Sequence, residues 1–480
     1  MTNANGAGVP AQATGVRRPS LRFVAAFACA AGLLGGTGAG QQAKIRPRVA
    51  LWIECEGRLH SLDDAARVRA AIDSAAALGA TDVFLQVYRN GRAWFPTRLA
   101  DDAPYERARA EGFDPITLAI DRAHRRGIRV HAWVNVLRVE GGKKLLTALG
   151  PEALLHDGAE PGTPFRPDTP GAWLDPTSPA VAARIGGILV DLAQAYPALD
   201  GVHLDYVRYP VAVPMKNSRS PAGEADLGWS ESAAAQFRKN TGRDPHRDRA
   251  GWDAFRRDHL TNFVRSLRQR LRMANPRLEL SAAVIPEPDR ARHGALQDWP
   301  AWARGGILDL VVPMNYAKDA VVFARLARAC GVRRGPAAML MGIGAWRLGG
   351  APAIAARVRL AMDTRVDGVA LFSHDNLGTH PGLMRRLGEL LRSQDVLPRG
   401  PRASHSAGHA LRADTSTRLT LRGAAFDDAS WITGKVYRVD TSAFTVFTKS
   451  TTCAASPACG SLPPIPRAEN LRTFEVARLE

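Results

Sequence analysis

The same pattern recurs eight times along this chain: a short stretch with a two-residue apolar period, then a longer stretch with a helical period. The eight short stretches are residues 49–56, 81–89, 128–135, 200–209, 278–285, 308–316, 338–345 and 367–374. Strands that alternate with helices form parallel sheets, and eight such units can close into a barrel. We therefore predict an α/β fold, a (β/α)8 TIM barrel.

A doubly wound open sheet is the competing fold, but no Gly-rich phosphate loop follows the first strand. The strand faces also favour a barrel, because on four strands the residues of one parity are apolar and suit contact with helices. The other parity then points into the barrel and carries polar and aromatic side chains. This inward set comprises Trp52, Glu54, Gln86, Tyr88, His131, Trp133, Asn135, His203 and Asp205.

The N-terminus has the layout of a secretory signal peptide. A polar leader with three arginines precedes an apolar run at 23–34, and small residues follow at 35–40. The run is too short for a stable membrane anchor, and no other stretch is apolar enough to span a bilayer. We expect export to the periplasm or the medium by the general or the twin-arginine route, and lipid anchoring at Cys29 is less favoured.

We divide the chain into a signal peptide and leader at 1–43, the barrel at 44–397, and a linker with a small or partly disordered tail at 398–480. The tail is rich in Ser, Thr and Arg, and its Cys453 and Cys459 are spaced to close a small disulfide in an exported protein. Cys55 and Cys330 lie in apolar segments and are expected in the core. No spacing resembles a zinc site, so we expect neither a metal nor a cofactor.

The formal net charge of +18 comes mostly from Arg. The chain has no block of Lys and Arg and no nucleic-acid motif, so nucleic acid is not an expected partner. Attraction to an acidic surface or polymer stays open, because net charge alone is unspecific.

The fourth strand is the most informative. It lies in the segment 200–210, DGVHLDYVRYP, where His203 and Asp205 share a face because strand side chains alternate. Polar groups late in a barrel strand indicate the C-terminal mouth, where TIM-barrel enzymes carry out their chemistry. For Asp205 taken alone, a buried carboxylate bonded to backbone or to an Arg is an equally weighted alternative.

Aromatics and carboxylates at the mouth of an exported barrel favour a saccharide ligand, and glycoside hydrolysis usually needs two carboxyl groups. We predict Asp205 and Glu287 as this catalytic pair, because strands four and five are neighbours in a barrel. A solvated loop position is the alternative for Glu287; Glu54, Glu56, Asp289 and Asp298 are other candidates. The predicted sugar-binding residues are Trp52, Glu54, Glu56, Gln86, Tyr88, Arg89, His131, Trp133, Asn135, His203, Arg208, Tyr209, Asn315, Tyr316 and His374.

Three segments, 172–176 (AWLDP), 200–210 and 312–316 (VPMNY), resemble glycoside-hydrolase-like family 10, also called domain of unknown function 187. The resemblance covers residues 48–395. It implies an exported bacterial protein, often a lipoprotein, with a TIM barrel that acts on a polysaccharide such as cell-wall glycan. It also implies a catalytic carboxylate at Asp205. The first strand and the Pro-Met-Asn-Tyr of the sixth depart from the family pattern, which leaves the substrate open.

Two other kinds of site are less favoured by the sequence. His131, His203 and Asp205 on interior faces invite a metal site, but the first strand lacks the His-x-His pair that metal-dependent hydrolases of this fold commonly have. Ser373 and His374 are adjacent and point to opposite faces, so they make a poor nucleophile and base. A saccharide-binding barrel without catalysis is the alternative function, and the sequence does not distinguish retaining from inverting chemistry.

Overall fold

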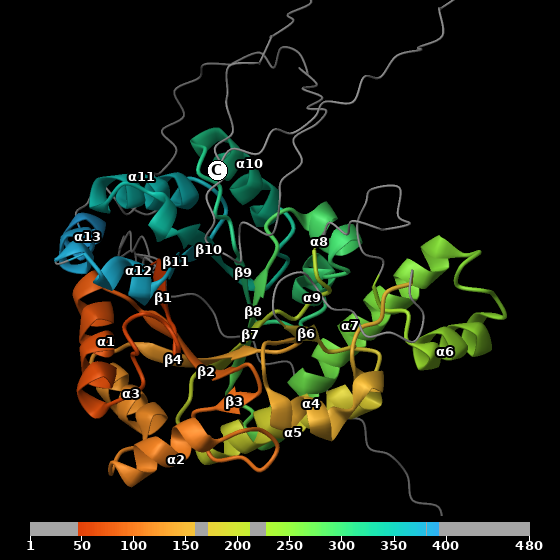
Figure 1. Ribbon diagram of the computed structural model, residues 1–480. Coiled ribbons are helices and arrows are strands. Elements are labelled where there is room, and N and C mark those ends of the chain that lie inside the picture. The colour runs from red at the N-terminus through yellow and green to blue at the C-terminus, as the bar shows by residue number, and fades with distance from the viewer. Residues whose placement is uncertain (1–46, 159–170, 212–226, 381, 393–480) are drawn as a thin grey trace, which may run out of the picture. The chain divides into compact units, whose positions relative to one another are not determined.

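The computed structural model describes residues 47–158, 171–211, 227–380 and 382–392 (Figure 1). Apart from residues 210 and 211, these residues belong to one compact unit. The predicted signal peptide, the C-terminal tail and the Cys453–Cys459 pair lie outside the described residues.

Eight parallel strands close into a barrel, which confirms the predicted fold. Neighbouring strands pair in chain order, and the ring closes where the last strand pairs with the first, Val49 lying opposite Val369. The barrel strands are β1 (Arg48–Ile53), β2 (Asp82–Arg89), β4 (Arg129–Asn135), β7 (Gly201–Asp205), β8 (Glu279–Val284), β9 (Leu310–Pro313), β10 (Ala338–Gly344) and β11 (Gly368–Phe372).

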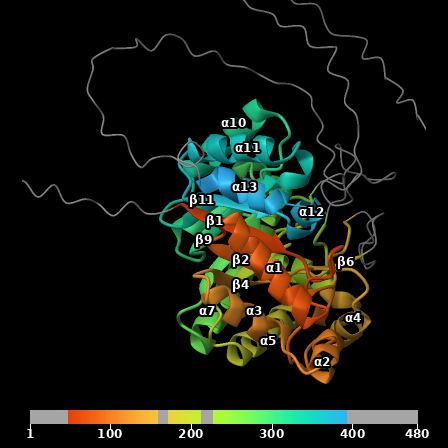
Figure 2. The same cartoon turned by 90° about the vertical axis from the view of Figure 1, so that its left-hand side faces the viewer.

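Helices follow each strand and surround the barrel (Figures 1 and 2). Their starts follow the sequence signals: the Asp114 carboxylate accepts hydrogen bonds from the N–H groups of Ile116 and Thr117, and Pro115 occupies the first helical position. The main helices are α1 (Ala65–Leu78), α3 (Pro115–His124), α5 (Pro179–Ala195), α7 (Arg249–Ala274), α9 (Trp299–Arg304), α10 (Ala320–Gly331), α11 (Ala351–Met362) and α13 (Leu383–Arg392).

Shorter elements decorate the connections at the C-terminal ends of the strands. Strand β3 (Arg92–Ala93) pairs antiparallel with β2, and β5 (Arg138–Val139) pairs with β6 (Ala172–Trp173) in the connection after β4. The additional helices are α2 (Ala103–Ala110), α4 (Lys143–Leu149), α6 (Glu231–Thr241), α8 (Pro288–Gly294) and α12 (His374–Gly378), with 3-10 turns at Pro151–Ala153 and Ala345–Arg347.

The barrel interior is a packed core. Trp52 and Phe84 lie 5.3 Å apart between ring centroids, and both are fully buried among aliphatic residues of the facing strands. Cys55 and Cys330 are buried free thiols, as predicted. The inward-facing side chains leave no pore, so chemistry has room only at the ends of the strands.

The N-terminal ends of the strands carry an ionic network. Arg48 binds both oxygens of Asp82 and both oxygens of Glu279, at 2.7 to 3.2 Å. Arg129 lies 3.0 Å from Asp82, and His131 Nε2 lies 3.3 Å from the same carboxylate. This network joins β1, β2, β4 and β8 at the end of a TIM barrel that generally serves stability.

Candidate active site

Asp205 is the last residue of β7 and lies at the mouth, 8% exposed. Trp133 Nε1, on the neighbouring strand, donates to its Oδ2 at 3.2 Å, and the Tyr206 N–H donates to its Oδ1 at 2.7 Å. Burial raises the pKa of Asp205, although the Tyr206 N–H, Arg208, Trp133 and Arg138 all favour the ionised form. The two hydrogen bonds therefore fix the position of the carboxyl group, and its pKa lies above the usual value.

Two arginines flank this carboxyl group, one from the connection after β4 and one from the connection after β7. Arg138 and Arg208 stand over the Tyr206 ring, with their guanidinium carbons 5.6 and 5.3 Å from its centroid. Trp173, from β6, meets the same ring edge-on at 5.9 Å. Aromatic faces and cationic donors thus gather on the side of the mouth next to Asp205.

Glu54 lies across the mouth at the end of β1 and is partly buried. Ser373 Oγ donates to Glu54 Oε2 at 2.7 Å, and Asn376 Nδ2 donates to Ser373 Oγ at 2.9 Å. Burial raises the pKa of Glu54; the Ser373 hydroxyl and Arg89 oppose this, and the charge of Asp375 adds to it. The pairing of β1 with β11 brings these residues together although they are far apart in sequence.

A β-bulge in β2 decides which side chains of that strand reach the mouth. Gln86 lies opposite Trp133, but Tyr88 lies opposite Val134, so the register slips by one residue between them. Tyr88 therefore faces the helix layer, where Arg184 of α5 acts on its phenol. The predicted inward position of Tyr88 is wrong, because strict alternation holds only in a strand without a bulge.

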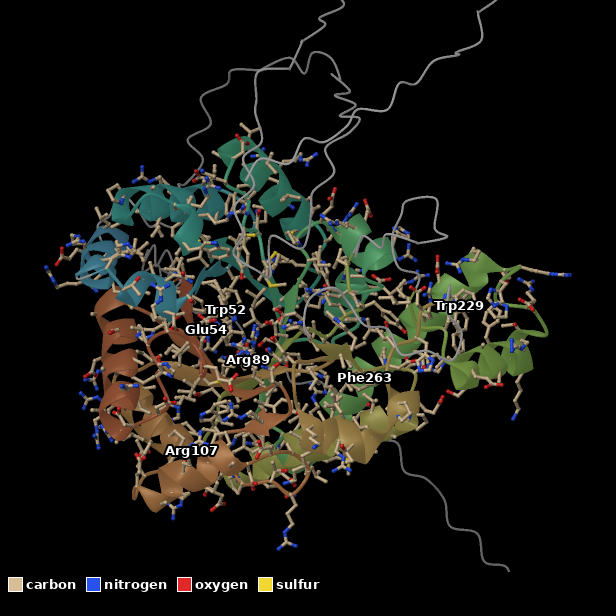
Figure 3. All side chains as sticks on the ribbon, in the orientation of Figure 1. Trp52, Glu54, Arg89, Arg107, Trp229 and Phe263 are labelled. Carbon is tan, nitrogen blue, oxygen red and sulfur yellow. The ribbon has the colours of Figure 1, made fainter. Side chains whose placement is uncertain are left out.

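Arg89 takes the inward position that the bulge denies to Tyr88. Its guanidinium acts electrostatically on Glu54 and on the Tyr206 phenol, and its Nε lies 3.5 Å from Glu56. Figure 3 shows Arg89 and Glu54 near each other over the barrel, close to Trp52. The predicted residues Arg89, Glu54 and Glu56 thus gather in one place.

Tyr316 connects the two sides of the mouth. It follows β9, and burial raises the pKa of its phenol well above the usual value. The charges of Asp205, Tyr206 and Glu54 raise this pKa further. Both carboxyl groups therefore act on one phenol, and we call the region around these three side chains the common space.

Gln86 and Asn135 add two amide side chains beside this space. Gln86 Nε2 donates to Asn135 Oδ1 at 3.3 Å, and Gln86 Oε1 accepts the Cys55 N–H at 3.4 Å. Asn135 in turn lies opposite Asp205 in the strand register. These hydrogen bonds link the ends of β2 and β4 to the segment after β1.

The other predicted histidines and Trp52 lie deeper. Trp52 Nε1 donates to His203 Nε2 at 3.2 Å, and His203 Nδ1 lies 2.9 Å from Ser281 Oγ; the ring stacks on Phe84 at 4.0 Å. Burial lowers the pKa of His203 well below its usual value, so the ring is neutral. His131 belongs to the ionic network at the other end of the barrel. Neither histidine lines the mouth.

Several predicted residues are held by contacts outside the common space. Asn315 Nδ2 donates to the Phe323 carbonyl of α10 at 2.9 Å. His374 Nδ1 lies 3.2 Å from Ser61 Oγ, and Tyr209 is buried with no hydrogen-bond partner for its hydroxyl among the described residues. Glu287 is exposed at the start of α8, where its side chain makes no capping hydrogen bond.

The alternative carboxylates after β8 are engaged elsewhere. Asp289 pairs with Arg333 at 3.2 Å, and Asp298 pairs with Arg292 at 3.0 Å while it caps α9. In the described part of the chain, no group of three or more His, Cys, Asp or Glu side chains is arranged to hold a metal ion. The carboxyl groups that burial perturbs at the mouth are Glu54 and Asp205.

The sequence did not single out several residues that the structure brings to the mouth, among them Arg138, Tyr206 and Asp375 and the three that follow. Asn376 stands behind Ser373, and its signal is the Ser-x-x-Asn spacing on one helical turn. Trp173 belongs to the AWLDP segment, whose role was left undefined. Trp346 packs edge-on against Tyr316 at 4.9 Å, and its only signal is its place just after the seventh strand.

The model of the Glycosyl hydrolase-like 10 family matches residues 46–334 of this chain, which include the mouth residues of the first six barrel strands. The chain belongs to this family. The resemblance carried by residues 172–176, 200–210 and 312–316 is thus confirmed.

Curated relatives are distant. Glycosyl hydrolase DigH of Escherichia coli is 25% identical over 269 residues, which are 51% of this chain and 56% of the relative. Glycosyl hydrolase YngK of Bacillus subtilis is 21% identical over 268 residues, 51% of this chain and 48% of the relative. The chain therefore spans about half the length of the curated relatives it matches.

Solved structures share the fold. The glycoside hydrolase domain of PgaB (BpsB) from Bordetella bronchiseptica aligns with a TM-score of 0.54 at 17% identity, covering 72% of this chain and 98% of that domain. The catalytic domain of β-amylase from Paenibacillus polymyxa aligns with a TM-score of 0.51 at 10% identity, covering 74% and 100%. Both structures share the TIM-barrel fold of this chain. Within the described residues, no helix is both long and apolar enough to cross a bilayer.

Proposed function

We propose that the protein is a glycoside hydrolase that cleaves a polysaccharide at the C-terminal mouth of its barrel, with Glu54 and Asp205 as the paired carboxyl groups. The observation that carries this proposal is that Glu54 and Asp205 stand at the C-terminal ends of the barrel strands β1 and β7 and both act electrostatically on the Tyr316 phenol. Glycoside hydrolysis usually requires two carboxyl groups on either side of the scissile bond. Glu54 takes the role predicted for Glu287, because Glu287 is exposed, whereas Glu54 is partly buried and acts on the same phenol as Asp205.

The neighbours of the two groups suggest different roles. Burial raises both pKa values, but Asp205 accepts two hydrogen bonds and has Arg208 and Arg138 nearby, all of which stabilise its anion. Glu54 accepts one hydrogen bond, from Ser373, and has Arg89 nearby, which favour its anion, but it also has the like charge of Asp375, which favours its protonated form. Pairs of carboxyl groups whose surroundings differ in this way divide into acid and base. We assign Glu54 as the proton donor to the leaving oxygen and Asp205 as the ionised partner.

The proposed substrate is a polysaccharide, with bacterial cell-wall glycan as the first candidate, and the proposed location is the periplasm or the medium. The aromatic rings of Trp173 and Tyr206 and the donors of Arg138 and Arg208 suit a sugar with several hydroxyl groups. The names of the relatives DigH and YngK as glycosyl hydrolases support the reaction class. The export signal proposed for residues 1–43 supports the location.

The test is a digestion screen with the full chain against bacterial cell-wall glycans and common plant and storage polysaccharides, with products read by mass spectrometry. Asp205→Asn is expected to lower turnover by about 10³-fold, the usual size of a lost acid–base group, while it still binds glycan. Glu287→Gln is the matched control and is expected to retain activity. Unchanged turnover in Asp205→Asn would refute the proposal.

A second assay separates the roles of the two carboxyl groups. Glu54→Gln is expected to recover activity on aryl glycosides with good leaving groups, because these need no proton donor. Asp205→Asn is expected to stay inactive on both kinds of substrate. Equal losses for Glu54→Gln on both substrates would reject Glu54 as the acid.

The alternative function is a saccharide-binding barrel without catalysis. It is favoured by the hydrogen bonds that both Asp205 oxygens already accept from the protein. Glycan binding without any cleavage would establish this alternative.

A further inference from the structure

A cavity of about 910 Å³ lies beside the mouth, where the connection from β10 to α11 meets α12 and α13. Its volume is within the range of about 300–1,000 Å³ that is usual for ligand sites. Neither Glu54 nor Asp205 lines it. It is therefore a separate place, which the proposed reaction does not use.

Trp346 forms the wall between this cavity and the mouth. Its ring meets Tyr316 edge-on at 4.9 Å and Phe372 edge-on at 5.5 Å, and it also lines the cavity. The cavity and the mouth therefore lie on either side of one aromatic side chain. A polymer bound across the carboxyl pair can extend over Trp346 into the cavity.

Trp346 is also unusually exposed. It is 37% exposed, and the other large hydrophobic side chains with high exposure in the described residues are aliphatic: Met273, Val321 and Val332. Tryptophan combines a large apolar face with a polar N–H, and it is enriched where proteins bind ligands that have both kinds of surface. A pyranose ring is such a ligand, with an apolar C–H face and a rim of hydroxyl groups.

The remaining walls combine apolar and hydrogen-bonding groups. Ile354 and Leu383 line the cavity together with Asn376, His380 and Arg386. An amide, an imidazole and a guanidinium supply donors and acceptors suited to hydroxyl groups. A sugar chain would use both kinds of wall, because its C–H faces suit the apolar groups and its hydroxyl groups suit the polar ones.

We propose that this cavity is an accessory subsite that holds glycosyl units of the polysaccharide away from the cleaved bond, with Trp346 as the stacking platform. This inference rests on the proposed glycosidase function and adds to it the path of the polymer. Long oligosaccharides then bind more tightly than short ones, because only long ones reach the cavity.

The experiment measures binding of a disaccharide and an octasaccharide from peptidoglycan glycan strands, with cello- and malto-oligosaccharides of the same lengths in parallel. Calorimetry is carried out with the full chain in an Asp205→Asn background, which prevents cleavage. Trp346→Ala is expected to lower the ratio of octasaccharide to disaccharide affinity about tenfold, and Trp346→Phe is expected to restore most of the ratio.

Two arginines on α13 provide a matched pair that does not touch Tyr316. Arg386 lines the cavity, whereas its neighbour Arg385 is absent from the lining and pairs with the cavity-lining Glu389 at 2.8 Å. Arg386→Ala is expected to lower the octasaccharide affinity severalfold, Arg385→Ala is expected to change it less because it acts only through Glu389, and the exposed Val332→Ala is expected to leave it unchanged. Thermal unfolding of each variant verifies that it is folded.

The outcomes separate this inference from the proposed function. An unchanged affinity ratio in Trp346→Ala and Arg386→Ala, or no binding of any octasaccharide, overturns the subsite even if the wild-type protein cleaves glycan. Octasaccharide binding that depends on Trp346, in a protein that cleaves nothing, supports the subsite and overturns the hydrolase. Cleavage together with the expected loss of chain-length preference supports both.

Discussion

The hydroxyl of Ser373 donates a 2.7 Å hydrogen bond to Glu54, across a separation of 319 residues in the chain. The contact exists because the last strand of the barrel pairs with the first and places their C-terminal ends side by side. Asn376 fixes the Ser373 hydroxyl from behind, and Asp375 places a like charge near the same carboxyl group. Closure of the barrel therefore sets both the position and the protonation of Glu54.

Removing the Ser373 hydroxyl should move the alkaline limb of the pH–rate profile to higher pH. The hydrogen bond favours the ionised form of Glu54, so Ser373→Ala raises the pKa of this carboxyl further. A proton donor is active below its pKa, so a raised pKa moves the loss of activity on the alkaline side to a higher pH. The measurement is kcat/KM against pH for the wild type and the variant; a shift to lower pH would contradict the assignment of Glu54 as the acid.

Asp375→Asn should have the opposite effect. Its negative charge disfavours ionisation of Glu54, so the neutral amide lowers the pKa of Glu54 and moves the alkaline limb to lower pH. The amide oxygen can still accept the Leu59 N–H, which Asp375 now accepts at 2.7 Å. The same pH series serves for measurement. Shifts of equal sign in Ser373→Ala and Asp375→Asn would show that the limb reports a different group.

Asp82→Asn should destabilise the barrel by about 3 kcal/mol at neutral pH, because it leaves Arg48 without its buried partner. Burial alone would raise the pKa of Asp82, but hydrogen bonds from His131 and Arg48 outweigh it and lower the pKa below its usual value. A depressed carboxyl pKa contributes stability that is complete above the unfolded value of about 3.9 and is lost as the pH falls below it.

Urea unfolding at several pH values tests this prediction. The difference in unfolding free energy between the wild type and Asp82→Asn should be constant near neutral pH and shrink below about pH 4. Asp73→Asn is the control, because Asp73 pairs with Arg122 at the surface, where a pair contributes about 0.5 kcal/mol. A gap that widens in acid would contradict the role of Asp82 in the network.

The sequence was sufficient to predict the barrel because its eight strand–helix repeats are long and regular. The same alternation placed Glu54, Gln86, Trp133, Asn135 and Asp205 on the inward faces, where their hydrogen bonds now lie. Depth within the barrel was harder to predict. Parity shows which way a side chain points but not how far along the barrel axis it lies, so His131 and His203 were grouped with the mouth.

Contacts between distant segments also could not be predicted from the sequence. The link from Glu54 to Ser373 and Asn376 depends on barrel closure, and no local pattern encodes it. The pairing of Asp205 with Glu287 assumed that carboxylates on neighbouring strands meet, but the chain after β8 turns Glu287 into solvent at the start of α8. The bulge in β2 has no clear sequence signal either, and it reversed the faces of Tyr88 and Arg89.

The bulge leads to a prediction that separates Tyr88 from Tyr316, both of which were predicted to bind sugar. Tyr88→Phe should leave kcat/KM within about twofold and the unfolding free energy within about 0.5 kcal/mol, because its hydroxyl faces the helix layer and has no hydrogen-bond partner among the described residues. Tyr316→Phe should instead lower kcat/KM about tenfold or more, since both carboxyl groups act electrostatically on its phenol. Kinetics and urea unfolding of both variants provide the comparison. A tenfold loss of activity in Tyr88→Phe with unchanged stability would place its hydroxyl at the mouth and reject the register slip.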